Sequence, residues 1–275
     1  MNGRHRAAVR FCSFIHPFTL LCVNIAFFGG TFDPVHRGHI AVAAGATKRF
    51  ELGKVLFVPA ELPPHKQNQS FSSFANRMAM VALATQGHLK FVPSDAEARL
   101  YRETGKPNYS LETIRHLKSE LKKADKLYFL IGIDAFIDIA KWHRPVELLR
   151  ECEFIVANRP GYSLGDVAAA LPEELRPKQE VLKAARKTSA DLASSGTVMV
   201  FSGVVLHLLQ DVSERVSSTQ LRAAAASSGR RLEGYVGDAV AEYIRKTRLY
   251  RSGTKAEDPP SPPSRTTPVK KKSGR

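Results

Sequence analysis

Short apolar runs typical of β-strands alternate along this chain with longer segments of helical spacing. The apolar runs predict strands at residues 24–28, 55–58, 91–93, 127–131, 154–157, 198–201 and 204–209. The patterns between them predict helices at residues 40–50, 74–85, 110–122, 145–150, 219–226 and 237–246. This alternation predicts an α/β fold, with a mostly parallel sheet, helices on both faces and a small helical C-terminal part. Ligands of such sheets bind beyond the carboxyl ends of the strands.

Residues 24–250 carry this alternation, and we expect them to form one domain in which residues 163–197, rich in Ala, Lys and Glu, are a helical surface insertion. The apolar run at residues 11–28 resembles a signal peptide or a short membrane anchor. Polar residues and a proline interrupt the run, and its last residues fit a buried strand, so we expect neither export nor membrane association. Residues 1–23 are then a poorly ordered extension. Residues 251–275, basic and rich in Pro and Ser, predict a disordered tail.

Composition narrows the class of protein further. Hydrophobic residues make up 43% of the chain and charged residues 24%, which is close to the average for soluble globular proteins. The formal net charge of +15 suits an anionic ligand such as a nucleotide, a nucleic acid or a membrane surface. The three cysteines are widely spaced and form no C-x-x-C pair, which argues against a disulfide framework or a zinc site and fits the reducing cytoplasm.

The most informative segment follows the first predicted strand and reads Phe28-Gly29-Gly30-Thr31-Phe32-Asp33-Pro34-Val35-His36-Arg37-Gly38-His39. Gly29 and Gly30 permit positive φ angles and a close approach of a ligand to the backbone. His36 and His39 are three positions apart, so they share one face of a first helical turn, and Gly38 leaves space between them. Helix-start N–H groups attract anions, so this turn predicts a cradle for a polyphosphate. The alternative is that the histidines bind a metal or cap the helix.

The string GGTFDPVHRGH resembles the signature of nucleotidyltransferases that share an H-x-G-H element with class I aminoacyl-tRNA synthetases. Further matching segments follow in the expected order, namely Pro63-Pro64-His65-Lys66, Asn108-Tyr109-Ser110, Gly132-Ile133-Asp134, Trp142 and Ser217-Ser218-Thr219-Gln220-Leu221-Arg222. Together they resemble the bacterial nicotinate-nucleotide adenylyltransferase family over about residues 24–250. The resemblance implies a Rossmann-like fold and the transfer of an adenylyl group from ATP.

A second phosphate clamp is predicted opposite the histidines. Ser217, Ser218 and Thr219 supply hydroxyls and N–H groups at a predicted helix start, and Arg222 follows one turn further on. This combination favours phosphate, although the same segment also fits an ordinary N-cap. The resemblance implies that this clamp holds the β- and γ-phosphates of ATP, and that His36, His39 and Arg222 are catalytic. The residues implied to bind ATP are Gly29, Gly30, Thr31, Phe32, His36, Gly38, His39, Gly132, Asp134, Arg159, Ser217, Ser218, Thr219 and Arg222.

The resemblance also implies a site for the second substrate, nicotinate mononucleotide. Its implied contacts are Asp33, His65, Lys66, Tyr109, Ser110, Trp142 and His143. Two prolines stiffen the loop that presents His65 and Lys66. Trp142, the only tryptophan, is implied to stack on the pyridine ring, and a core position is the alternative. His143 stands where many relatives have tyrosine.

The implied reaction is ATP + nicotinate mononucleotide → nicotinate adenine dinucleotide + diphosphate, a step of NAD biosynthesis. The 5′-phosphate of the mononucleotide attacks the α-phosphorus in line, so catalysis rests on positioning and on neutralising charge rather than on a general base. Mg²⁺ bound with ATP is the implied cofactor, and we expect no metal site built by the protein alone. Asp134 is expected to accept from ribose hydroxyls or to orient Mg²⁺ through water.

Other functions fit parts of the sequence. Within the superfamily, the substrate could instead be nicotinamide mononucleotide, phosphopantetheine or, with CTP, an alcohol phosphate. Outside it, the net charge fits a nucleic-acid-binding protein, but no RRM, helix-turn-helix or aromatic platform supports this. We therefore expect ATP and nicotinate mononucleotide as partners, with neither nucleic acid nor membrane, while the oligomeric state stays open.

Overall fold

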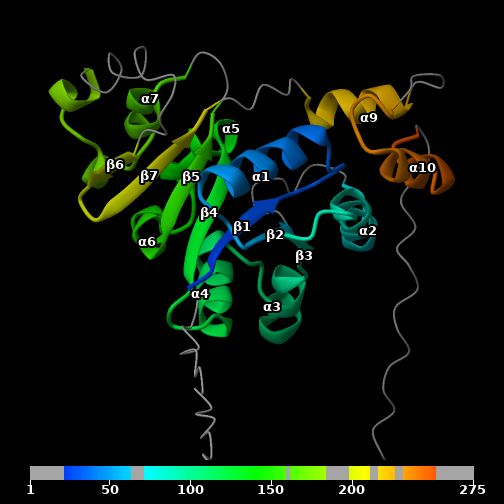
Figure 1. Cartoon of the computed structure of the whole chain (residues 1–275), viewed down its shortest axis with the longest axis horizontal. Coiled ribbons are helices and arrows are strands. Elements are labelled where there is room, and N and C mark those ends of the chain that lie inside the picture. Colours follow the sequence, from blue (N-terminus) through cyan, green and yellow to red (C-terminus); the bar gives the residue numbers. More distant parts are fainter. Residues whose placement is uncertain are drawn as a thin grey trace, which may run out of the picture.

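The computed structural model of the chain describes residues 22–62, 71–158, 162–183, 198–210, 216–226 and 232–251. They contain a seven-stranded sheet in the order β3-β2-β1-β4-β5-β7-β6 (Figure 1). The strands are β1 (Asn24–Gly30), β2 (Lys54–Pro59), β3 (Phe91–Pro93), β4 (Lys126–Gly132), β5 (Glu153–Ala157), β6 (Val198–Phe201) and β7 (Val204–Leu209). Every neighbouring pair is parallel except β6 and β7. The predicted fold class, a mostly parallel α/β sheet, is confirmed.

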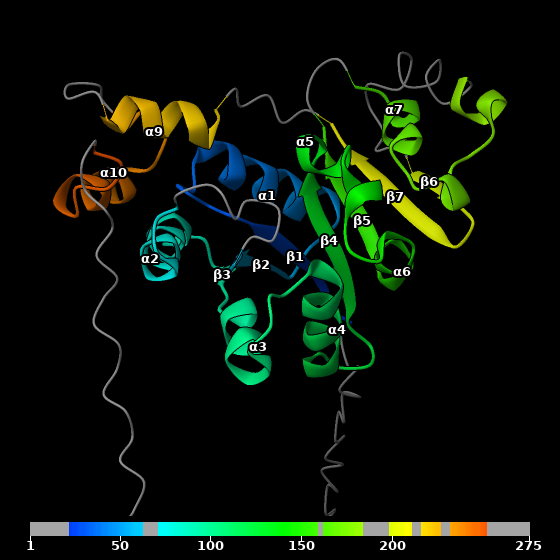
Figure 2. The same ribbon diagram turned by 180° about the vertical axis from the view of Figure 1, so that it is seen from behind.

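Helices cover both faces of the sheet (Figures 1 and 2). They are α1 (Arg37–Arg49), α2 (Phe74–Thr85), α3 (Ala96–Thr104), α4 (Ser110–Glu120), α5 (Ile133–Phe136), α6 (Pro145–Glu151), α7 (Leu164–Ala169), α9 (Ser218–Ala226) and α10 (Asp238–Lys246), with 3₁₀ turns η2 (Ile139–Lys141) and η3 (Glu173–Leu175). Alternate residues of β1 supply the two cores. Ile25 and Phe27 belong to the core that includes buried residues of α4, α6 and α7, whereas Ala26 and Phe28 belong to the core that includes buried residues of α1, α2 and α10. A strand buried on both faces explains its continuous apolar run.

Helix boundaries differ from the sequence prediction at two places that matter for the site. Helix α1 begins at Arg37, three residues earlier than predicted, and so includes His39. Helix α3 was not predicted, because its sequence AEARLYRET is short and mostly polar. Only the start of α3, at Ala96, Glu97 and Ala98, is buried. Tertiary packing therefore stabilises a helix that its own apolar pattern does not indicate.

Several predicted segments lie partly or wholly outside the described residues. These segments are the N-terminal extension before residue 22, the part of the 163–197 insertion after residue 183 and the tail after residue 251. The predictions for these segments stay predictions. The described part of the insertion contains α7 and η3, which follow β5 near the β6–β7 edge of the sheet (Figure 1).

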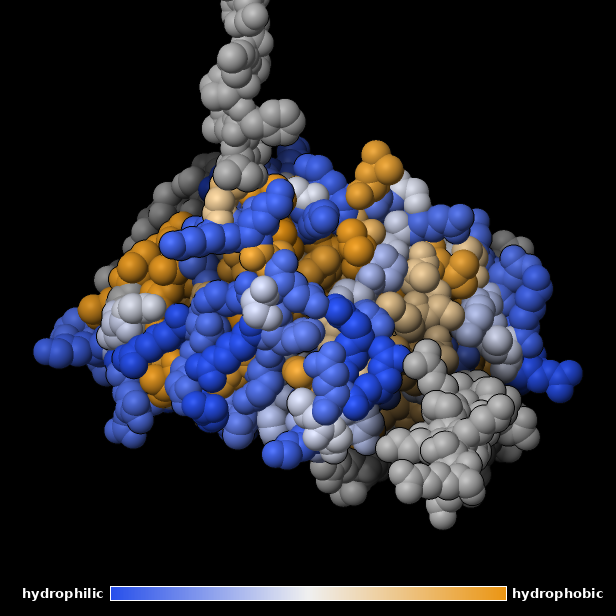
Figure 3. All heavy atoms as spheres, turned by 90° about the horizontal axis from the view of Figure 1, so that it is seen from below, coloured by the Kyte–Doolittle hydropathy of each residue, from blue (hydrophilic) through white to orange (hydrophobic). Residues whose placement is uncertain are grey.

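The surface of the described residues is mixed in polarity. Figure 3 shows a face on which hydrophilic side chains surround smaller groups of apolar ones. Two of the exposed apolar residues, Val198 and Val200, lie on the edge strand β6. Within the described ranges, no helix combines the length and the apolar composition needed to span a bilayer.

Candidate active site

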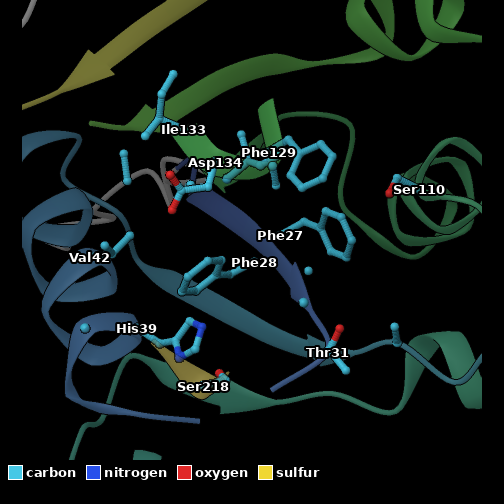
Figure 4. Close-up of a pocket in the computed structure, with 18 of the residues that line it drawn as sticks. Phe27, Phe28, Thr31, His39, Val42, Ser110, Phe129, Ile133, Asp134 and Ser218 are labelled. Atoms are coloured by element: carbon cyan, nitrogen blue, oxygen red, sulfur yellow. The ribbon is translucent and has the colours of Figure 1, made fainter. Parts of the chain in front are cut away.

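A cavity of about 480 Å³ lies at the carboxyl edge of the sheet, where β1 and β4 end. The chain runs outward from β1 to β3 and then adds β4 on the other side of β1, so the strand order reverses here. Open α/β sheets bind ligands at such a switch point, and the volume is in the usual range for ligand pockets. Figure 4 shows His39 and Ser218 on one side of this cavity and Ser110 and Phe129 on the other.

The turn between β1 and α1 brings the two predicted histidines together. His36 is extended, with φ −142° and ψ 171°, and is the N-cap residue of α1, so only His39 belongs to the helix. Their rings nevertheless stack, with centroids 3.7 Å apart and an interplanar angle of 27°. Both histidines line the cavity together with Gly38. Two imidazoles at a helix start thus face one space, as a polyphosphate cradle requires.

A hydrogen bond within this turn determines which nitrogen of His39 can donate to a ligand. The backbone N–H of His36 donates to His39 Nδ1 over 3.1 Å. Because an N–H group needs an acceptor, Nδ1 carries no proton, and the proton of the neutral ring resides on Nε2. His39 is therefore arranged as a hydrogen-bond donor through Nε2, which is the role that an anionic ligand needs.

The two glycines serve packing rather than backbone conformation, contrary to the prediction of positive φ angles. Gly29 and Gly30 belong to strand β1, and neither has a positive φ. A Cβ atom on Gly29 would lie 2.7 Å from the Phe27 ring, and one on Gly30 would lie 3.2 Å from the Phe32 ring. The positive φ of this turn, 50°, belongs instead to Phe32. Glycine is needed because aromatic rings pack against the strand where it borders the cavity.

The N-terminus of α9 contacts the histidine turn directly. Ser218 Oγ donates to the Pro34 carbonyl over 3.1 Å, and Arg222 Nη1 donates to the Asp33 carbonyl over 2.8 Å. Ser217 and Ser218 line the same cavity as the histidines, whereas Thr219 and Arg222 are not among its lining residues. Arg222 thus supports the turn through a main-chain carbonyl. The predicted second clamp and the histidine turn form adjoining walls of one cavity.

Asp33 and Phe32, predicted as ligand contacts, face the protein interior. Asp33 is 2% exposed, and its carboxylate accepts from the Tyr250 hydroxyl over 2.6 Å and from the Ser72 N–H over 3.2 Å. Burial, followed by the charge of Asp33, raises the pKa of the Tyr250 hydroxyl. The Phe32 ring packs edge-on against the His39 ring, with centroids 5.0 Å apart. Both residues therefore hold the turn in place.

Aromatic side chains form the opposite end of the cavity. The rings of Tyr109 and His143 stack with centroids 4.2 Å apart, and Trp142 lies 6.2 Å from Phe129. All four line the cavity, together with Ser110 at the start of α4. A flat ring can insert between such side chains, because aromatic groups favour stacked and edge-on contacts.

Between the two ends, the carboxyl end of β4 reaches the cavity. Gly132 ends β4, and Asp134 follows in α5 with an exposed side chain. Both residues line the cavity, which fits their place at the carboxyl end of a strand, where ligands of such sheets bind. His65, Lys66 and Arg159, which were also predicted as contacts, lie outside the described residues.

Two residues with special environments were missed by the sequence analysis. Glu97, at the start of α3, lines the cavity although its side chain is only 7% exposed. Burial raises the pKa of Glu97 to about 7, although the hydrogen bond from the Glu61 N–H and the charge of Arg77 lower it. Arg77 is 2% exposed and donates to main-chain carbonyls. Neither residue lies in a recognisable motif, so a single sequence holds no signal for them.

The described residues contain no cluster of three or more His, Cys, Asp and Glu side chains that could hold a metal ion. The two histidines are therefore a pair without further protein ligands in that part of the chain. Their geometry fits hydrogen bonding to an anion better than the alternative of a metal pair.

Known proteins place the chain in a class and then in a family. Residues 27–224 match the family model described as cytidylyltransferase-like. The chain is 36% identical over 222 residues to a probable nicotinate-nucleotide adenylyltransferase of Geobacter metallireducens, covering 81% of this chain and 95% of that protein. It is also 36% identical over 229 residues to one of Pseudomonas fluorescens, covering 83% and 98% respectively.

The switch-point cavity, the paired histidines and the matched model together define a nucleotidyltransferase of the cytidylyltransferase-like class. Solved structures show the same fold. One is nicotinic acid mononucleotide adenylyltransferase from Plasmodium falciparum complexed with NaAD, with a TM-score of 0.58 at 18% identity, covering 83% of this chain and 97% of that one. Because its relatives align over nearly their whole length, the chain belongs to the nicotinate-nucleotide adenylyltransferase family.

Proposed function

We propose that this protein transfers the adenylyl group of ATP to nicotinate mononucleotide, which yields nicotinate adenine dinucleotide and diphosphate in NAD biosynthesis. The observation that carries the proposal is a single cavity with two different ends. One end has two stacked imidazoles and the serines that begin α9, and the other has Trp142, Tyr109 and His143. The first suits the triphosphate of ATP and the second suits a pyridine ring.

In this arrangement, His36 and His39 hold the triphosphate with the helix-start N–H groups of α1. His39 donates from Nε2, because its Nδ1 is occupied by the His36 N–H. The hydroxyls of Ser217 and Ser218 form the adjoining wall. Donors at fixed positions stabilise charge that develops on the α-phosphate and on the leaving diphosphate, and this preorganisation lowers the barrier.

The mononucleotide phosphate is itself the nucleophile, so no side chain is required to remove a proton. The phosphate oxygen forms a bond to the α-phosphorus as the bond to the bridging oxygen of diphosphate breaks. The aromatic end positions the mononucleotide for this in-line attack by holding its base. We propose that Trp142 stacks on the base and that the amides at the start of α4, near Ser110, contact its carboxylate.

Mg²⁺ enters this proposal with ATP. The phosphate oxygens of ATP would supply most of its ligands, because Mg²⁺ is usually held by one or two carboxylates together with substrate phosphates. Asp134 has an exposed carboxylate on the cavity wall and would hold the ion through water. When bound, the ion supplies neutralisation of the phosphate charges.

The proposal also covers the cellular compartment of the protein and the bounds of its catalytic domain. Cys22 and Cys152 are free thiols, which supports a reducing compartment such as the cytoplasm. We propose that residues 24–250 form the catalytic domain. The described start of the 163–197 insertion contributes no lining residue to the cavity, but it is not a purely surface segment, because Leu164, Val167 and Leu171 are buried in the core on one face of the sheet.

The test is release of diphosphate from ATP by the purified full-length chain with Mg²⁺. Nicotinate mononucleotide, nicotinamide mononucleotide and phosphopantetheine are supplied one at a time. We expect the highest kcat/KM with nicotinate mononucleotide, together with formation of the matching dinucleotide. A chain that turns over phosphopantetheine alone, or no acceptor at all, would refute the proposal.

A further inference from the structure

Glu97 brings a carboxyl group into the wall of the aromatic end of the cavity. The side-chain Nδ2 of Asn108 donates to the main-chain carbonyl of Glu97, which joins α3 to the segment that begins α4. Asn108 directly precedes Tyr109 and Ser110, and all four residues line the cavity. The Tyr109 ring stacks on His143, so Glu97 lies beside the side chains that form this end.

The charged and polar groups around Glu97 come from three neighbouring elements. From the end of β2, the Glu61 N–H donates to Glu97 Oε2 over 3.2 Å, and the Glu61 carboxylate faces Glu97 as a like charge. From α2, Arg77 faces it as an opposite charge, and from α4 the Thr113 hydroxyl bonds to it. Arg102, on α3 itself, interacts with Glu61. Because burial outweighs the favourable partners, the pKa of Glu97 rises to about 7.

Few other charges act at this end. No lysine or arginine is among the described residues that line the cavity. His143 also lies at this end, where its ring stacks on Tyr109. Its Nε2 lies 3.8 Å from Glu112 Oε1. A ligand carboxylate bound between Tyr109, Ser110 and Trp142 would therefore respond to the charge on Glu97.

We propose that Glu97 makes the choice between the acid and the amide mononucleotide depend on pH. The neutral carboxyl tolerates the carboxylate of nicotinate mononucleotide, whereas the ionised form repels it and leaves the neutral amide unaffected. This inference rests on the proposed function and deepens it. Glu97 is a specificity-determining residue in this scheme, because both substrates undergo the same reaction at the phosphate.

The test uses the ratio of kcat/KM for nicotinate mononucleotide to kcat/KM for nicotinamide mononucleotide, measured between about pH 6 and about pH 8. Both substrates share the phosphate, the ribose and ATP, so the ratio cancels ionisations at the phosphate end of the cavity, including those of His36 and His39. It also cancels a general loss of folding. We expect the wild-type ratio to fall roughly tenfold through about pH 7, because the ionised carboxyl of Glu97 then repels the carboxylate of the bound substrate.

Two variants separate the effect of Glu97 from that of His143. Glu97→Gln keeps an oxygen that accepts from the Glu61 N–H but cannot ionise, so its ratio should stay near the wild-type low-pH value at every pH. His143→Phe keeps a ring against Tyr109 without the imidazole nitrogens, and its ratio should still fall with pH. A pH-independent ratio in the wild type, or a Glu97→Gln ratio that falls like that of the wild type, overturns the inference. Absence of turnover with either mononucleotide would instead overturn the proposed function.

Discussion

Replacement of Arg77 by methionine tests how the turn that carries the histidines is held. Arg77 projects from α2 into the interior, where Nε donates to the Ser72 carbonyl over 3.0 Å. Nη1 donates to the carbonyls of Thr31 and Ala60 over 3.0 Å and 2.6 Å, and Nη2 reaches the Glu61 carbonyl at 3.4 Å. One guanidinium therefore ties the end of β1, the end of β2 and the start of α2 together.

The expected loss of unfolding free energy follows from the hydrogen-bond acceptors that Arg77→Met leaves without a donor. Methionine fills a similar volume, so the loss is one of hydrogen bonds and charge rather than of packing. Several buried carbonyls lose a charged donor, and the carboxyl groups of Asp33 and Glu97 lose an opposite charge. Removing the charged donor from a buried network while its partners remain costs about 3–5 kcal/mol of unfolding free energy. For a domain of this size, that corresponds to a Tm lower by about 6–20 °C.

The assay is urea denaturation at pH 7, followed by circular dichroism, with thermal unfolding as a second measurement. Arg77→Lys should recover part of the loss, because an ammonium group keeps the charge but not the planar fork. Arg102→Met is the matched control. Its side chain is 68% exposed and pairs with Asp95, so its removal should change stability by less than about 1 kcal/mol. A loss below about 1 kcal/mol for Arg77→Met, with an unchanged m-value, would refute the reasoning.

Two further predictions concern the histidine turn and the buried carboxyl. His39→Asn keeps an acceptor near the Nδ1 position, so it should leave stability unchanged yet lower kcat about 10²–10³-fold. His39→Gln places a donor near the Nε2 position and should retain more activity. Equal rates in both variants would exclude the Nε2 donor. The pKa of Glu97 is raised from 4.5 to about 7, so its contribution to stability is complete below about pH 4.5 and is lost as the pH rises through about 7, a fall of about 3 kcal/mol. Denaturation of Glu97→Gln across that range should lack this fall, and an unchanged slope would contradict the assignment.

The strands and the histidine pair could be predicted because their signals are local. β1 is buried on both faces, so it reads as an uninterrupted apolar run, and the turn after it carries both histidines within four residues. Helix α3 could not be predicted, because α4 and the sheet stabilise it rather than its own pattern. The antiparallel pairing of β6 with β7 follows from a short turn at Ser202 and Gly203, both with positive φ.

The orientation of single side chains could not be predicted from the sequence, because it depends on neighbours that are distant along the chain. Asp33 lies within the recognisable turn, yet its carboxylate faces inward to Tyr250, more than two hundred residues later. Arg222 likewise supports the Asp33 carbonyl and is not among the residues that line the cavity. A sequence pattern states which residue types are near each other along the chain, but it does not state which way each side chain points.

The sequence by itself determined the alternating α/β architecture, the glycine-histidine turn and the family, since each depends on periodicity or on residues close together in the chain. The tertiary structure alone decided that His39 presents Nε2, that Arg77 joins three segments and that Glu97 enters the cavity wall with a raised pKa. These features depend on burial and on hydrogen-bond partners, which exist only after distant segments have packed against one another.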